Sequence, residues 1–193
     1  PSIVPGEHIK SPWFYKTLFS SHTEGVFLAS YAKHVYEYNV VDVIYTDDYA
    51  NTIKQDFSLP FIGIGGKIKN EWRINKNNIE NDILNISKKL LAGQHPADAI
   101  FLATDAAVAA QIIALIKRKG LIYKIFGNHF LAEDEFIAEL SYFPEELYNL
   151  GYFSNKVAAV SPLILDIGNE KAQVFKKSFI DLYKRSLNWV EAS

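Results

Sequence analysis

Apolar and polar residues form two patterns that alternate along this chain. Short segments that are apolar, or alternate loosely with polar residues, predict five strands at residues 40–45, 67–74, 99–103, 123–126 and 157–160. The longer segments between them carry apolar residues three or four positions apart, which is the period of a helix with one buried face. Strands and helices in strict alternation predict an α/β fold with a doubly wound parallel sheet and right-handed crossovers.

The first helical segment has a recognisable beginning. Residues 21–24, Ser-His-Thr-Glu, have the spacing of a capping box, in which a serine and a glutamate satisfy the first backbone N–H groups. Behind it, Phe27, Tyr31, Val35 and Tyr38 recur at helical intervals and predict the buried face. Further helices are expected near residues 49–57, 78–91, 105–119 and 170–185.

Proline and glycine predict where these elements are interrupted or end. Pro60 is expected to disturb the later part of the helix that begins near Tyr49. The glycines of Gly63-Ile-Gly-Gly66 follow a helix and precede a strand, the reverse of a dinucleotide-binding fingerprint, so they predict a helix-ending turn. Residues 143–155, rich in aromatics, glycine and proline, are expected to form a loop that leaves the α/β core.

Composition excludes several classes of function. With 193 residues, 49% of them hydrophobic, the chain can bury the core of one large domain or two small ones. Its 20 basic and 22 acidic residues are interspersed, so the sequence has no electrostatic footprint for nucleic acid or an anionic membrane. The absence of cysteine excludes disulfides, thiolate metal sites and cysteine nucleophiles.

The start of the chain and its longest apolar segment indicate whether the sequence contains a signal peptide or a membrane span. The sequence begins at Pro1 without an initiator methionine or a signal peptide, and we expect it to be a fragment. The longest apolar segment, residues 106–116, is interrupted by Gln111 and falls short of the roughly 20 residues that a membrane span requires. We therefore expect no direct insertion into a membrane.

Polar side chains follow three of the predicted strands. In an open parallel sheet, ligands bind beyond the carboxyl ends of the strands, and these ends should share one rim. The candidate ligand-binding residues are Asp48, Tyr49, Thr104, Asp105, Asn128 and His129. For the adjacent Asp47 and Asp48, phosphoryl transfer would need a further acidic pair at an earlier strand end and a lysine after a later strand, and neither is evident. Ligand recognition and helix capping both stay open for this pair.

Asp105 and His129 each have two possible roles. Asp105 can cap the helix that follows it, and the small residues behind it would also let a zwitterion approach the helix N-terminus. His129 is either a ligand contact or a solvated loop histidine. The five histidines show no metal-ligand spacing and no serine lies in a nucleophile elbow, so we predict no metal site, cofactor or catalytic residue.

The order of these segments resembles the type I periplasmic binding proteins, in particular the receptor for leucine, isoleucine and valine that feeds an ABC importer. The resemblance extends from about Ser11 to Arg185 and is strongest over residues 98–127. It is carried by SPWFYKTLFS at residues 11–20, VVDVIYTDDYANTIKQDF at 40–57, GGKIKNEWRI at 65–74 and PADAIFLATDAAVAAQIIALIKRKGLIYKIFGNHFLAEDEFI at 96–137.

This resemblance implies a domain organisation. In that family two α/β lobes close on a small ligand, and the chain looks like the second lobe, at residues 15–160. Residues 1–14 would be the tail of lobe one and a hinge crossing, and residues 161–193 a hinge-proximal segment with a closing helix. The first lobe, which holds the ligand carboxylate in the family, is not represented in this chain.

The resemblance also implies roles for three residues. Tyr49 falls where the family places a tyrosine against the ligand. Asp105 falls where the amino-acid receptor has a tyrosine, and His129 where it has a glutamate that pairs with the α-ammonium group. Asp105 would then take over the ammonium contact, whereas His129 departs from the branched-chain pattern and leaves another amino acid, a small amide or an aromatic acid as the ligand.

The implied protein is a non-enzymatic, periplasmic or otherwise extracytoplasmic solute-binding protein. It would capture a small polar ligand, an amino acid or related compound, by hinge closure and present it to an ABC permease. A ligand-binding sensor module of a membrane receptor or kinase is the alternative with the same fold, and sequence beyond Ser193 would distinguish the two. A third hypothesis, an enzyme of flavodoxin-like or Rossmann type, would require bound flavin or nucleotide.

Overall fold

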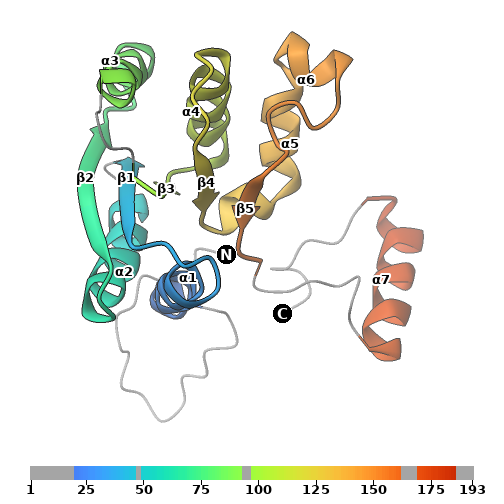
Figure 1. Cartoon of the computed structure of the whole chain (residues 1–193). Coiled ribbons are helices and arrows are strands. Elements are labelled where there is room, and N and C mark those ends of the chain that lie inside the picture. The colour runs from blue at the N-terminus through green and yellow to red at the C-terminus, as the bar shows by residue number, and fades with distance from the viewer. Residues whose placement is uncertain (1–19, 47–48, 93–96, 162–168, 186–193) are drawn as a thin grey trace.

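Five parallel strands form the centre of the computed structural model, which describes residues 20–46, 49–92, 97–161 and 169–185. Their order in the sheet is β2-β1-β3-β4-β5 (Figure 1). The strands are β1 (Val40–Thr46), β2 (Lys67–Ile74), β3 (Ala99–Ala103), β4 (Lys124–Gly127) and β5 (Val157–Ala159). The predicted doubly wound parallel sheet is confirmed, and each strand lies within one residue of its predicted bounds.

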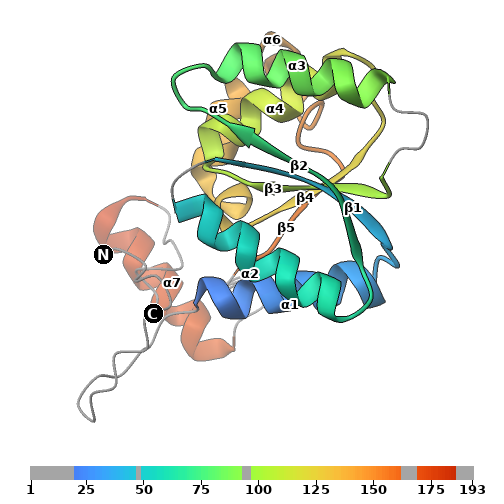
Figure 2. The ribbon, with the colours of Figure 1, turned by 90° about the vertical axis from the view of Figure 1, so that its left-hand side faces the viewer.

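Helices cover both faces of this sheet. On one face lie α1 (Ser21–His34) and α2 (Tyr49–Gly63), and on the other α3 (Ile79–Ala92), α4 (Ala106–Arg118) and α5 (Asp134–Ser141) (Figures 1 and 2). The remaining elements are the 3-10 turn η1 (His129–Ala132), α6 (Pro144–Tyr148) and α7 (Glu170–Tyr183). The turn predicted from Gly63 to Gly66 is confirmed, because α2 ends there and β2 follows directly.

The two faces bury cores of different chemistry. Under α1 and α2, Phe57, Phe61, Phe101 and Phe126 form an aromatic cluster, with the ring centroids of Phe57 and Phe101 4.1 Å apart. On the other face the core consists mainly of isoleucine, leucine and alanine side chains from β3, α3 and α4. Because β3 contributes to both cores, all of its residues are buried, as expected for a parallel strand covered on both faces.

α1 packs through small side chains, so the predicted aromatic face is wrong. The exposed residues of that face are Phe27 (50%), Tyr31 (39%) and Val35 (56%). Tyr38 is buried, but it lies beyond the end of the helix. The buried side of α1 consists of Ser21, Glu24, Gly25, Leu28, Ala29 and Ala32. A face of this kind allows two helices to approach closely.

The close approach occurs where Gly25 meets α2. A β-carbon at Gly25 would lie 2.3 Å from the carbonyl carbon of Asp56 and 2.4 Å from its oxygen. In an uninterrupted helix that oxygen would accept the N–H of residue 60, but Pro60 has none. α2 nevertheless continues through Pro60 to Gly63, where the sequence predicted a disturbance. The carbonyl without its helical donor is therefore the group that packs against Gly25.

Residues 143–155 pack against the core, so the prediction that they form a loop leaving the core is wrong. Phe153 is fully buried, and the carboxylate of Glu146 accepts hydrogen bonds from the backbone N–H groups of Gly151 (2.8 Å) and Phe153 (2.5 Å) and from the Ser154 hydroxyl (3.0 Å). Burial acts to raise the pKa of Glu146, but these donors outweigh it and hold the pKa below its ordinary value. One buried carboxylate thus fixes the segment.

α7 has no buried residue within the described part of the chain. Two of its large apolar side chains, Phe175 and Leu182, are 45% and 72% exposed. Residues 1–19, 162–168 and 186–193 lie outside the described residues, so the proposed domain boundaries at residues 14 and 160 stay predictions.

A carboxylate is buried on β1, which lies between β2 and β3 in the sheet. Asp42 is 1% exposed and accepts a hydrogen bond from Asn70 Nδ2 (2.8 Å), at the point where the β1–β2 register is irregular. Burial raises the pKa of this carboxyl, and the Asn70 hydrogen bond and the charge of Lys69 offset part of that effect. The folded protein therefore binds the Asp42 proton more tightly than the unfolded chain does.

Gly25→Ala tests the contact between α1 and α2. We expect the free energy of unfolding to fall by about 1–3 kcal/mol, because the new methyl group overlaps the Asp56 backbone. Urea unfolding measures the change. The matched control is Gly63→Ala, which has no atom within 4 Å of the new methyl group and should be neutral or gain up to about 1 kcal/mol. Equal effects of the two substitutions would contradict this packing.

Asp42→Asn should change the pH dependence of stability. Because the folded-state pKa is raised, the stability associated with this group is fully present below the ordinary value of 3.8 and is lost as pH rises through the folded-state pKa. The amide keeps the acceptor for Asn70 and removes the charge. The stability of the variant relative to the wild type should therefore increase from pH 3 to pH 7 in urea titrations, and a difference independent of pH would exclude a raised pKa.

Candidate functional site

The carboxyl ends of β1 and β3 lie at the topological switch point of the sheet. β1 continues into α2 on one face, whereas β3 continues into α4 on the other, so no crossover covers the position between them. The last residue of β1, Thr46, and the residue after β3, Thr104, are both fully buried. The groups that a ligand can reach at this rim must therefore come from the residues that follow.

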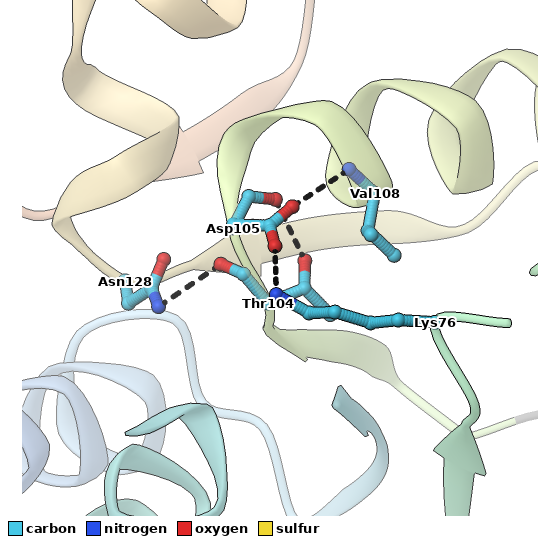
Figure 3. Close-up of polar contacts among 5 residues, drawn as sticks. All are labelled: Lys76, Thr104, Asp105, Val108 and Asn128. Atoms are coloured by element: carbon cyan, nitrogen blue, oxygen red, sulfur yellow. Dashed lines mark hydrogen bonds and ion pairs between the residues drawn. The ribbon is translucent and has the colours of Figure 1, made fainter. Parts of the chain in front are cut away.

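Among the predicted site residues that the structure describes, Asp105 reaches the surface. Its Oδ1 accepts the backbone N–H of Val108 (3.0 Å) and so caps α4, as the sequence predicted (Figure 3). Its Oδ2 lies 2.6 Å from Nζ of Lys76, an ion pair that the sequence did not predict. The side chains of Asp105 and Lys76 are 36% and 47% exposed, so both remain accessible at the rim.

Lys76 lies in a turn after β2 that is held by side-chain hydrogen bonds. The backbone N–H of Asn75 donates to Asp82 (2.9 Å), the N–H of Asn77 donates to the Asn75 side chain (2.9 Å), and Asn78 Nδ2 donates to Asp82 (3.1 Å). This turn follows β2, and β1 lies between β2 and β3 in the sheet. The Lys76–Asp105 pair therefore spans the carboxyl end of β1.

Thr104 and Asn128 join the ends of β3 and β4 beneath this surface. Asn128 Nδ2 donates to the carbonyl oxygen of Thr104 (3.2 Å), and the Thr104 hydroxyl donates to the carbonyl oxygen of Asp105 (3.2 Å) (Figure 3). Both residues are fully buried, and Asn128 Oδ1 has no partner among the described residues. They support Asp105 from below, and their contact with a ligand stays a prediction.

His129 is buried and held by Glu24. Its backbone N–H donates to Glu24 Oε1 (2.6 Å) and its Nδ1 lies 2.8 Å from Glu24 Oε2, with each residue 2% exposed. His129 is therefore not the solvated loop histidine that the sequence left open. The predicted capping box of Ser21 and Glu24 is wrong. Ser20 caps α1 by accepting the N–H of Thr23, and Glu24 instead connects α1 to the β4–η1 junction through its hydrogen bonds to His129.

The predicted site residues that follow β1 are not described by the structure. Asp47, Asp48 and the side chain of Tyr49 lie outside the described residues, and their predicted contacts stay predictions. Among the described residues, no three histidine or acidic side chains are grouped to hold a metal ion. No helix in the described ranges is long and apolar enough to cross a membrane.

Two hollows lie elsewhere in the fold. One of about 560 Å³ is near the amino end of β4, and its lining includes Lys117, Ile122, Leu150 and Lys156. The other, of about 290 Å³, lies between α1 and β5 and is mostly apolar, with Phe27 and Val160 in its lining. Neither hollow is lined by a predicted site residue.

Solved substrate-binding proteins of ABC transporters have a similar fold. A putative branched-chain amino acid ABC transporter protein from Rhodospirillum rubrum matches with a TM-score of 0.72 and 20% identity, over 91% of this chain and 47% of that chain. LivJ from Streptococcus pneumoniae, solved with isoleucine, matches at 0.69 and 19%, over 87% and 44%. A solute-binding protein from R. palustris, solved with benzoate, matches at 0.66 and 18%, over 87% and 42%.

These similarities concern the fold. The predicted resemblance to type I periplasmic binding proteins is confirmed at that level, and the chain spans about half the length of the solved proteins it matches. No protein-family model and no curated protein sequence matches the chain.

Glu24→Ala tests how firmly the β4–η1 junction is held. We expect the free energy of unfolding to fall by about 2–5 kcal/mol, because the substitution leaves buried donors of His129 without their carboxylate. Glu24→Gln, which keeps one oxygen, should lose less. Urea unfolding is the measurement, with the exposed Glu135→Ala as control, expected within about 0.5 kcal/mol of the wild type. A loss no larger than that of the control would contradict a structural role for the pair.

Proposed function

We propose that this chain forms one lobe of a solute-binding protein that captures a small polar ligand, an amino acid or a related compound. The observation that carries the proposal is Asp105, a carboxylate accessible to solvent at the switch point of a parallel sheet. Ligands of open α/β sheets bind at this position. The fold is also that of proteins described as binding isoleucine and benzoate, which supports a binding role rather than catalysis.

The groups beneath Asp105 are arranged to hold it in place. The Val108 N–H binds one carboxylate oxygen, and the buried side chains of Thr104 and Asn128 donate to the backbone carbonyl groups of Asp105 and Thr104. A ligand that binds here therefore meets a charge whose orientation is already set, so little ordering is needed on binding. Such preorganisation is typical of recognition sites.

The mechanism that follows is closure on the ligand. At the rim, a ligand would contact Asp105 and its neighbours at the carboxyl ends of β1 and β3. The solved proteins with this fold are about twice as long as this chain, which supports a second lobe that supplies the opposite side. A ligand that contacts both lobes favours the closed state by its greater affinity for that state.

The partner and the location are part of the same proposal. Two matched proteins are described as substrate-binding proteins of transporters, one of them of an ABC transporter, and a third is described as a periplasmic substrate-binding protein. We infer that the closed form of this protein is presented to an ABC permease on the outer side of the membrane. Uptake, rather than signalling, is the output that the matched proteins support.

A thermal-shift screen tests the proposal directly. The natural protein that contains this chain is heated with amino acids, small amides and aromatic acids in turn. A ligand present at 100 times its dissociation constant should add about 2.7 kcal/mol of stability. One chemical class should raise the melting temperature, and a folded protein that responds to no member of the panel would contradict the proposed function.

Substitution of Asp105 tests the residue that carries the proposal. Asp105→Asn keeps a helix cap and removes the charge, so it should leave the melting temperature nearly unchanged and weaken ligand binding by about 1.5–3 kcal/mol. Asp105→Ala should lose the same affinity and also about 1 kcal/mol of stability. Calorimetric titration measures both affinities. Unchanged binding by the asparagine variant would reduce Asp105 to a cap.

A further inference from the structure

We propose that the hollow near the amino end of β4 is a second binding site, which takes a small aliphatic carboxylate such as a medium-chain fatty acid. The hollow lies between the C-terminal end of α4 and the segment that joins α6 to β5, and its volume of about 560 Å³ is typical of small-molecule sites. Because all five strands are parallel, the amino end of β4 and the rim lie at opposite edges of the sheet. The inference therefore goes beyond the proposed function.

Two lysines make this hollow attractive to an anion. The described residues that line it include Lys117 and Lys156 and no aspartate or glutamate. Within the described part of the chain, neither lysine belongs to an ion pair. The whole chain has a formal net charge of -2, so this concentration of positive charge is a local feature. A hollow lined by one sign of charge raises the local concentration of the opposite ion.

The ammonium group of Lys117 is held in position by the backbone. Its Nζ donates to the carbonyl oxygens of Phe153 (2.5 Å) and Asn155 (2.7 Å). An ammonium group has three N–H donors, so one remains for a ligand after these two bonds. Burial lowers the pKa of Lys117, the charge of Glu146 acts against that change, and the charge of Lys156 adds to it. A bound carboxylate would stabilise the charged form of Lys117.

The opposite wall of the hollow is also fixed. The carboxylate of Glu146 accepts the backbone N–H groups of Gly151 and Phe153. Gly151 lines the hollow with a φ of 90°, a conformation that a residue with a side chain rarely adopts. The shape of the hollow is therefore set by the folded chain, and a ligand would need to order little of it on binding.

Exposed aliphatic side chains specify the second part of the ligand. Ile122 is 100% exposed and Leu150 is 88% exposed, and both line the hollow. An alkyl chain that covers part of these side chains would remove apolar surface from water, which is favourable. The positive charge and the apolar surface together select a ligand with a carboxylate at one end and an alkyl chain at the other.

The chain offers matched controls for both properties. Lys119 lies at the same end of α4 but does not line the hollow, so Lys119→Met is the control for Lys156→Met. Ile137 on α5 is 53% exposed and also lies outside the lining, so Ile137→Ser is the control for Ile122→Ser. Lys117 is left unchanged, because its bonds to the backbone also hold the fold.

The experiment is calorimetric titration of the natural protein that contains this chain. The probes are octanoate, octanamide, which lacks the charge, and acetate, which lacks the alkyl chain. The wild type should bind octanoate at least about tenfold more tightly than either of the others. Lys156→Met should weaken octanoate binding about fivefold and Ile122→Ser about threefold, while Lys119→Met and Ile137→Ser should bind it like the wild type.

The outcomes distinguish this site from the rim. A wild type that does not bind octanoate, or binds octanamide as tightly, would overturn the inference and leave the proposed function intact. Octanoate binding that is unchanged in both Lys156→Met and Ile122→Ser would place the ligand elsewhere and overturn it as well. Loss of octanoate binding in Asp105→Asn would assign the ligand to the rim, with the same consequence.

Discussion

The parallel pairing of β1 with β3 is the constraint on which the rest of the structure depends. Parallel neighbours cannot be joined by a hairpin, so each connection must cross a face of the sheet. The connection after β1 crosses one face and the connection after β3 crosses the other, which leaves the carboxyl ends of these two strands uncovered between them. Every polar group of the candidate functional site stands at or beside this uncovered position.

The packing of α1 against α2 helps to hold the backbone beside the uncovered carboxyl ends of β1 and β3. Gly25 lets α1 lie against the backbone of α2, and Glu24 lies on the same buried side of α1. There Glu24 binds the backbone and ring of His129 and fixes the end of β4. The Glu24–His129 pair therefore supports the rim from α1, while the accessible charges of Lys76 and Asp105 follow β2 and β3.

Local patterns in the sequence were sufficient for the sheet but not for the contacts at the rim. The strands, the Asp105 cap and the turn after α2 depend on residues close together in sequence, where periodicity, capping and glycine have direct physical effects. The buried face of α1 was mispredicted because the approach of α2 selects small residues over aromatic ones. The Glu24–His129 pair, 105 residues apart, and the Lys76–Asp105 pair, 29 residues apart, depend on the finished topology, and no local pattern predicts them.

The most direct test of ligand binding at this rim is an amide NMR titration of the natural protein that contains this chain, with the ligand that stabilises it. Binding at the switch point predicts the largest shift changes at the amides of Lys76 and residues 106–108, where the backbone surrounds the exposed ion pair. Shift changes concentrated instead around residues 120–123, 149–152 and 155–156, which line the hollow near the amino end of β4, would contradict it.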